Sequence, residues 1–116
     1  MKILVIYCHP SNKSFTARMK DEFIRGLEDG GHTCQLIDLY QINFDETFSE
    51  EEYLREAFYD QALKVPKDVQ AHQRLINAND AVVFIYPVFW TEAPGKLVGW
   101  FHALGLMVLL MGLRLK

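Results

Sequence analysis

A short polar segment, HPSNK at residues 9–13, has the composition of an anion site. It follows an apolar run and precedes a helical pattern, so we expect it at a helix N-terminus, where unpaired N–H groups and the helix dipole favour negative charge. Lys13 adds a positive charge, and Ser14 and Thr16 carry hydroxyls that can donate to phosphate oxygens. The segment indicates a phosphate site. The equally open alternative is that Ser14 is only a helix N-cap and Lys13 a solvated side chain.

A second candidate segment is aromatic and framed by prolines. It consists of Pro87, Val88, Phe89 and Trp90, and it follows a run rich in β-branched and aromatic residues at 81–86. Pro94 suits the first turn of a helix, where its missing N–H would have no partner. The order is strand, aromatic loop, helix, and such a loop suits a flat ring. Phe89 and Trp90 have an alternative role as packing residues of a core or a dimer interface.

Strands and helices must position these two segments. Apolar runs predict strands at 2–8 and 81–86 that are buried inside a parallel sheet, and a further strand is expected at 33–39. Helices are expected at about 14–29, from a capping-box pattern at 49–52 to about 63, and at 67–78. This alternation predicts an α/β doubly wound parallel sheet.

The helical patterns also predict which side chains face the core. In the first helix these are the residues spaced four apart and their neighbours, namely Phe15, Met19, Phe23, Leu27, Ala17 and Ile24. In the helix at 67–78 they are Val69, Leu75 and Ile76. Lys20 and His72 are expected at the surface.

Topology adds a constraint on the two loops. In the strand order 2-1-3 of flavodoxin-like sheets, the loops after the first and third strands border one crevice. Here these are the polar and the aromatic segments, and a phosphate site beside an aromatic shelf fits flavin mononucleotide (FMN). The GxGxxG and P-loop patterns are absent, which argues against a Rossmann dinucleotide site or a nucleoside triphosphatase.

Two motifs resemble the flavodoxin-like NAD(P)H:quinone oxidoreductase family, to which the modulators of drug activity belong. They are HPSNKSFTARM at 9–19 and YPVFWTEAPGKLVGWF at 86–101. The resemblance implies a three-layer α/β/α fold and a flavoenzyme that transfers hydride from NAD(P)H through bound flavin to a quinone or similar acceptor. FMN is the expected cofactor and FAD the alternative. The cofactor carries the chemistry, so no side-chain nucleophile is needed.

The resemblance also implies two sets of cofactor-binding residues. The phosphate end would be held by His9, Ser14, Phe15 and Thr16, with Lys13 in the same loop. The isoalloxazine ring would be lined, partly through backbone N–H groups, by Pro87, Val88, Phe89 and Trp90.

Relatives in this family continue beyond the length of this chain, with further strands and a loop that closes over the flavin. We therefore expect the N-terminal portion of a single flavodoxin-like domain over 1–116, with the C-terminal strands missing or replaced and 102–116 as a divergent apolar tail. Residues 105–111 are the candidate for a replacement strand. The alternative function is a non-catalytic, truncated or regulatory module that binds flavin weakly or not at all.

Composition limits the partners. A net charge of -3 gives no electrostatic basis for binding nucleic acid. Cys8 and Cys34 fit neither a zinc pattern nor a disulfide scaffold, and with no signal-peptide pattern they predict a cytoplasmic protein. The apolar stretch 97–113 is shorter than the roughly 20 residues that span a bilayer, so no membrane insertion is expected. Exposed, it would promote self-association, and we expect a homodimer.

Overall fold

The computed structural model describes residues 1–47, 49–58 and 66–104. The strands are β1 (Lys2–Tyr7), β2 (Thr33–Asp38) and β3 (Ala81–Ile85), and the helices are α1 (Phe15–Asp29), α2 (Glu50–Phe58), α3 (Lys67–Ala78) and α4 (Gly95–Leu104). The strands form one parallel sheet in the order β2-β1-β3, which confirms the α/β flavodoxin-like arrangement. The predicted extension of the second helix to residue 63 and the candidate strand at 105–111 lie outside the described residues.

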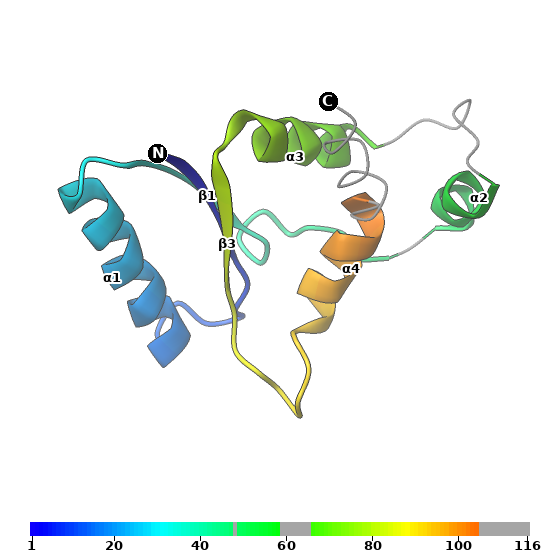
Figure 1. Ribbon diagram of the computed structural model, residues 1–116. Helices are drawn as coiled ribbons and strands as arrows, with labels where there is room; N and C mark the ends of the chain where they lie inside the picture. Colours follow the sequence, from blue (N-terminus) through cyan, green and yellow to red (C-terminus); the bar gives the residue numbers. More distant parts are fainter. Residues whose placement is uncertain (48, 59–65, 105–116) are drawn as a thin grey trace.

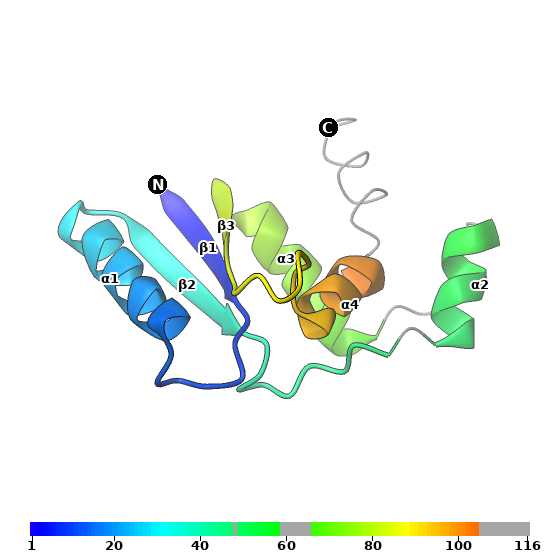
Figure 2. The same cartoon turned by 90° about the horizontal axis from the view of Figure 1, so that it is seen from below.

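The helices cover both faces of the sheet. Helix α1 lies on one face, and α3 and α4 lie on the other (Figures 1 and 2). Helix α2 lies farther from the sheet, beyond α4. No helix in the described part of the chain is long and apolar enough to span a bilayer.

The central strand β1 supplies the core of both layers. Its side chains alternate between the two faces, as in any strand. Leu4, Ile6 and Cys8 are fully buried in the cluster that also contains Leu97 and Trp100 of α4. The intervening residues of β1 are therefore turned toward α1.

The prediction that the strand at 81–86 is buried on both faces is wrong for β3. All its residues are only partly buried, because β3 is an edge strand of the described sheet. Strand β2 occupies the opposite edge, and its Leu36 is 41% exposed. Only β1, paired on both sides, is buried from Ile3 to Tyr7.

The predicted inner face of α1 is partly wrong as well. Phe15, Met19 and Phe23 are 69%, 53% and 37% exposed, whereas Ala17 is buried. A spacing of four residues turns about 40° further round the helix at each step, so the four-apart series does not stay on one face. Lys20 is partly buried instead, with a side chain 15% exposed, and its ammonium group lies over the Tyr7 ring.

Helix α1 ends at the predicted glycine pair. His32 N–H donates to the Leu27 carbonyl and Gly31 N–H to the Glu28 carbonyl, which is the hydrogen-bond pattern of a Schellman motif. The left-handed residue is Gly31, with φ of 82°. The chain thereby turns directly into β2.

His72 of α3 is buried, so its predicted surface position is wrong. The Trp100 indole N–H donates to His72 Nδ1 at 3.0 Å, and both groups are buried. The bond pairs two polar atoms that would otherwise be unsatisfied between α3 and α4. Val69, on the same helix, is buried as predicted.

The segment after β2 contacts α4 through Lys96 and Gly99. Lys96 Nζ donates to the Phe44 carbonyl at 2.7 Å and forms an ion pair with the Glu46 carboxylate at 2.9 Å. Gly99 packs directly on Glu46, because a Cβ at Gly99 would lie 2.7 Å from the Glu46 carbonyl oxygen. Only glycine allows α4 to approach this segment so closely.

We expect Gly99→Ala to destabilise the protein by about 1–3 kcal/mol, because its methyl group would overlap the Glu46 backbone. Gly26→Ala is the matched control, since a Cβ there meets nothing within 4 Å. In the interior of α1 it should stabilise the protein by about 0.5–1 kcal/mol. Urea denaturation of both variants measures the difference. Equal effects of the two substitutions would contradict the close contact.

The His72–Trp100 bond also predicts a pH dependence of stability. Burial lowers the pKa of His72 from its ordinary value of 6.5, although the nearby Asp68 carboxylate opposes this shift. The unfolded chain therefore binds a proton at a higher pH than the folded one. The contribution of neutral His72 is complete above pH 6.5 and is lost as the pH falls toward the lowered pKa.

His72→Asn is the variant that isolates this effect, because an amide oxygen can accept the Trp100 N–H but does not titrate in this range. Urea midpoints at about pH 7.5 and about pH 5.5 should differ more in the wild type than in this variant. A pH dependence that is the same in both proteins would show that His72 does not carry it.

Candidate functional site

The two segments singled out in the sequence lie at the same edge of the sheet. The first follows β1 and the second follows β3, and these neighbouring strands pair in register up to Tyr7 and Ile85. Cys8 N–H extends the pairing with a bond to the Ile85 carbonyl at 3.1 Å. Beyond this point the rings of His9 and Phe89 lie with centroids 6.1 Å apart. The polar loop and the aromatic loop therefore border one region, as the strand order predicts.

The His9 ring is oriented by a hydrogen bond from its own loop to Nδ1. The Ser11 N–H donates to His9 Nδ1 at 2.9 Å. Because Nδ1 accepts this bond, the proton of the neutral imidazole resides on Nε2. The ring is only partly buried. His9 can thus donate a hydrogen bond from Nε2 to an anion.

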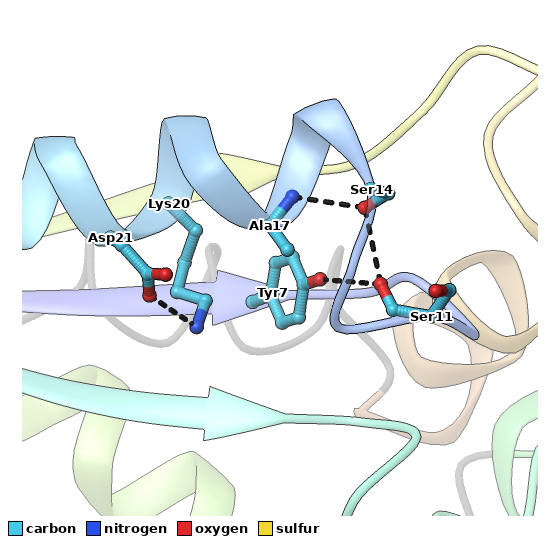
Figure 3. A network of polar contacts seen from close by, with 6 residues as sticks. All are labelled: Tyr7, Ser11, Ser14, Ala17, Lys20 and Asp21. Carbon is cyan, nitrogen blue, oxygen red and sulfur yellow. Dashed lines mark hydrogen bonds and ion pairs between the residues drawn. The ribbon is translucent and has the colours of Figure 1, made fainter.

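Ser14 is the N-cap of α1. Its hydroxyl oxygen accepts the Ala17 N–H at 3.0 Å and donates to the Ser11 carbonyl at 3.1 Å (Figure 3). The predicted N-cap role of Ser14 is confirmed, and its hydroxyl proton is donated within the loop. The first N–H groups of the helix, at Phe15 and Thr16, have no carbonyl acceptor within the helix. They are therefore suited to bind an anion.

No acidic side chain in the first turn of α1 reduces the positive potential at this helix end. The Lys13 side chain is exposed, and its backbone N–H donates to the Ser11 hydroxyl at 3.2 Å. Thr16 is partly buried, and Phe15 is exposed. Residues 9–16 therefore form a compact group of donors on one short stretch of backbone.

The aromatic loop is a tight hairpin turn. Phe89 and Glu92 exchange both backbone hydrogen bonds, at 3.0 and 2.9 Å, and enclose Trp90 and Thr91. These two residues have φ of 50° and 72°, which is the left-handed pattern of a type I′ turn. Asn-Gly is the usual pair in such a turn. A tryptophan and a β-branched threonine there are strained by about 1 kcal/mol or more each.

This strained turn holds the Trp90 side chain in the open. Trp90 is 95% exposed, which excludes a role in the core of the described chain. Val88 and Phe89 are 68% and 44% exposed, while Pro87 is partly buried. Backbone strain and exposed apolar surface tend to gather at binding sites, and here they coincide.

Sequence reasoning missed two residues beside the polar loop, Tyr7 and Lys20. The Tyr7 hydroxyl contacts the Ser11 carbonyl at 3.4 Å, and Lys20 Nζ lies 4.9 Å from the centre of the Tyr7 ring (Figure 3). Burial raises the pKa of Tyr7, so its hydroxyl stays protonated at neutral pH. Strand alternation turns Tyr7 toward α1, and this signal was present in the sequence.

The site offers no activated thiol. Cys8 lies at the end of β1 but is fully buried, and burial raises the pKa of its thiol to about 11. Cys34 is partly buried, and neither cysteine forms a disulfide. Nothing in the described ranges groups three or more His, Cys, Asp or Glu side chains for a metal ion.

Comparison with known proteins connects this arrangement to a family. The sequence profile described as a flavodoxin-like fold matches residues 1–104. The chain is 30% identical over 114 residues to the ribosyldihydronicotinamide dehydrogenase [quinone] of Mus musculus, covering 85% of this chain and 48% of the relative. It is 26% identical to the NAD(P)H dehydrogenase [quinone] 1 of Rattus norvegicus, covering 87% and 42%.

A solved structure agrees with the sequence matches. The NAD(P)H:quinone oxidoreductase from Methanothermobacter marburgensis superposes with a TM-score of 0.85 at 40% identity, covering 90% of this chain and 53% of that protein. The chain spans about half the length of the relatives it matches. By profile, sequence and superposition, the chain belongs to the flavodoxin-like NAD(P)H:quinone oxidoreductase family.

Proposed function

We propose that this chain binds a flavin and serves in an NAD(P)H oxidoreductase that reduces a quinone or similar acceptor. The observation that carries the proposal is the meeting of the polar loop and the strained aromatic turn at one sheet edge, with the His9 and Phe89 rings 6.1 Å apart. The names of the relatives, which specify NAD(P)H and quinone, support the same reaction class.

The phosphate end of the flavin would be bound by the polar loop. His9 Nε2 and the N–H groups of Phe15 and Thr16 are the donors, and Lys13 supplies positive charge. Ser14 contributes by holding the loop and capping the helix, since its hydroxyl is bonded to the Ser11 carbonyl. The donor set fits a dianionic phosphate monoester.

The ring of the flavin would lie on the aromatic turn. Val88, Phe89 and Trp90 provide exposed apolar surface beside Pro87. The Phe89 N–H is bonded within the hairpin, so the backbone donors toward the ring would come from Val88 and Trp90. Such oriented N–H groups favour negative charge on a bound ring.

Bound flavin would supply the chemistry, taking hydride from NADH or NADPH and passing it to the acceptor. The residues of this chain bind and orient the cofactor. None acts as a nucleophile, which agrees with the buried, protonated thiol of Cys8.

The remaining parts of the proposal concern the whole protein. FMN is the proposed cofactor, with FAD as the alternative, in a single flavodoxin-like domain with a divergent tail from residue 102. We further propose a cytoplasmic homodimer. The exposed apolar side chains of Phe15, Met19 and Phe23 on α1 would suit contact with a second copy.

The alternative is a non-catalytic flavodoxin-like module with weak or no flavin binding. It is favoured by one observation, namely that this chain spans only about half the length of its relatives. Flavin binding and flavin reduction separate the two functions.

Purified protein incubated with excess FMN and then desalted should retain the flavin absorbance. Under anaerobic conditions, addition of NADH or NADPH should bleach that absorbance, and addition of a quinone should restore it. A protein that stays colourless would refute the proposal and leave the non-catalytic module. Retained flavin that neither nucleotide reduces would support binding without catalysis by this chain.

Trp90→Ala should weaken binding of FMN and riboflavin alike, roughly tenfold, because both carry the ring that the exposed indole would contact. Tyr53→Ala is the matched control. It removes another exposed aromatic side chain, 54% exposed, from helix α2. Quenching of flavin fluorescence gives both affinities. Unchanged binding in Trp90→Ala would show that the ring lies elsewhere.

A further inference from the structure

Ser11 is the junction of the polar loop. Its N–H donates to His9 Nδ1 at 2.9 Å, and its hydroxyl oxygen accepts the Lys13 N–H at 3.2 Å. Its carbonyl accepts the Ser14 hydroxyl at 3.1 Å. Three residues proposed to bind or frame the phosphate are therefore oriented through this one residue, which is itself exposed.

All three of these bonds are internal to the loop. The contact that ties Ser11 to the sheet comes from the Tyr7 hydroxyl, which lies 3.4 Å from the Ser11 carbonyl. Figure 3 shows the Tyr7 phenol at the end of β1, with its hydroxyl directed at the Ser11 carbonyl.

The Tyr7 ring is itself firmly held. Its side chain is fully buried, and its backbone pairs with Asp38 of β2 and Ile85 of β3. The Lys20 ammonium group lies 4.9 Å from the ring centre and is bonded to the Asp21 carboxylate at 2.7 Å. A cation over the face of an aromatic ring is attracted to it, so Lys20 of α1 stabilises the position of the Tyr7 ring. The hydroxyl thus belongs to a fully buried side chain on the central strand of the sheet.

We propose that Tyr7 is a positioning residue for the phosphate end of the flavin. Its hydroxyl fixes the Ser11 carbonyl, and through Ser11 it sets the orientation of the His9 imidazole and the path of the backbone into α1. Tyr7 contacts the loop and not the cofactor. The proposal rests on the proposed flavin site and extends it to a residue behind the binding loop.

This role has a specific signature, because the Tyr7 hydroxyl contacts Ser11 of the polar loop and the Tyr7 ring lies beside Lys20 of α1. Loss of the hydroxyl should loosen the donors for phosphate and leave the aromatic turn unchanged. Binding of FMN, which carries a phosphate, should weaken, whereas binding of riboflavin, which lacks it, should not. A general loss of stability would weaken both ligands together.

Tyr7→Phe is the direct test. It removes the hydroxyl and keeps the ring under Lys20, and Ser11 still accepts the Ser14 hydroxyl. The dissociation constant for FMN should rise roughly threefold to tenfold, as expected for the loss of one hydrogen bond, with that for riboflavin unchanged. Tyr53→Phe on α2 removes an exposed hydroxyl far along the chain and should change neither constant.

Two results would overturn the inference. If Tyr7→Phe lowers both affinities equally, or neither, Tyr7 does not position the phosphate site, while the flavin proposal stands. If the wild type itself binds FMN no more tightly than riboflavin, the phosphate site is wrong and the role of Tyr7 is wrong with it.

A measurement on the wild-type protein keeps the inference testable should the variant not fold. In protein labelled with ¹³C at tyrosine Cζ, FMN should shift the Tyr7 resonance, because the phosphate tightens the loop around Ser11. Riboflavin should shift it less. A Tyr7 signal that responds equally to both ligands, or to neither, contradicts the proposal.

Discussion

The parallel pairing of β1 with β3 is the constraint on which the site depends. The ladder continues one residue past the strands, through the bond from Cys8 N–H to the Ile85 carbonyl, before the two loops diverge. His9 and Phe89, which are 80 positions apart in sequence, are brought together by this pairing. The fully buried Leu4, Ile6 and Cys8 hold β1 against α3 and α4, so the position of the loops is set by the core.

The two loops reach their shapes by different physical means. The polar loop satisfies its own groups through Ser11 and Ser14, so it is ordered by hydrogen bonds, and the donors of α1 remain available to an anion. The aromatic turn is held by the reciprocal bonds of Phe89 and Glu92 against an unfavourable backbone at Trp90 and Thr91. One loop is relaxed and the other strained, and strain of this kind persists only where the surrounding structure enforces it.

Much of this arrangement could be predicted from the sequence. The strands, the helix at 67–78, the strand order 2-1-3 and the adjacency of the two loops follow from short apolar runs and the rules for parallel sheets. The burial of single residues could not. The spacing of apolar residues predicted that Phe15 faces the core. In the structure it is exposed, because the orientation of α1 on the sheet is set by packing that the sequence pattern does not show. The acceptor role of His72 depends on Trp100, which lies 28 positions away.

The contrast between the two tryptophans gives the protein a built-in optical label. Trp90 is almost fully open to water, whereas Trp100 is enclosed by Phe84, Phe101 and His72. Emission from an indole depends on the polarity around it, so the spectrum should divide into a long-wavelength part from Trp90 and a short-wavelength part from Trp100. The first reports events at the sheet edge and the second reports the state of the interior, and no dye needs to be attached to observe either.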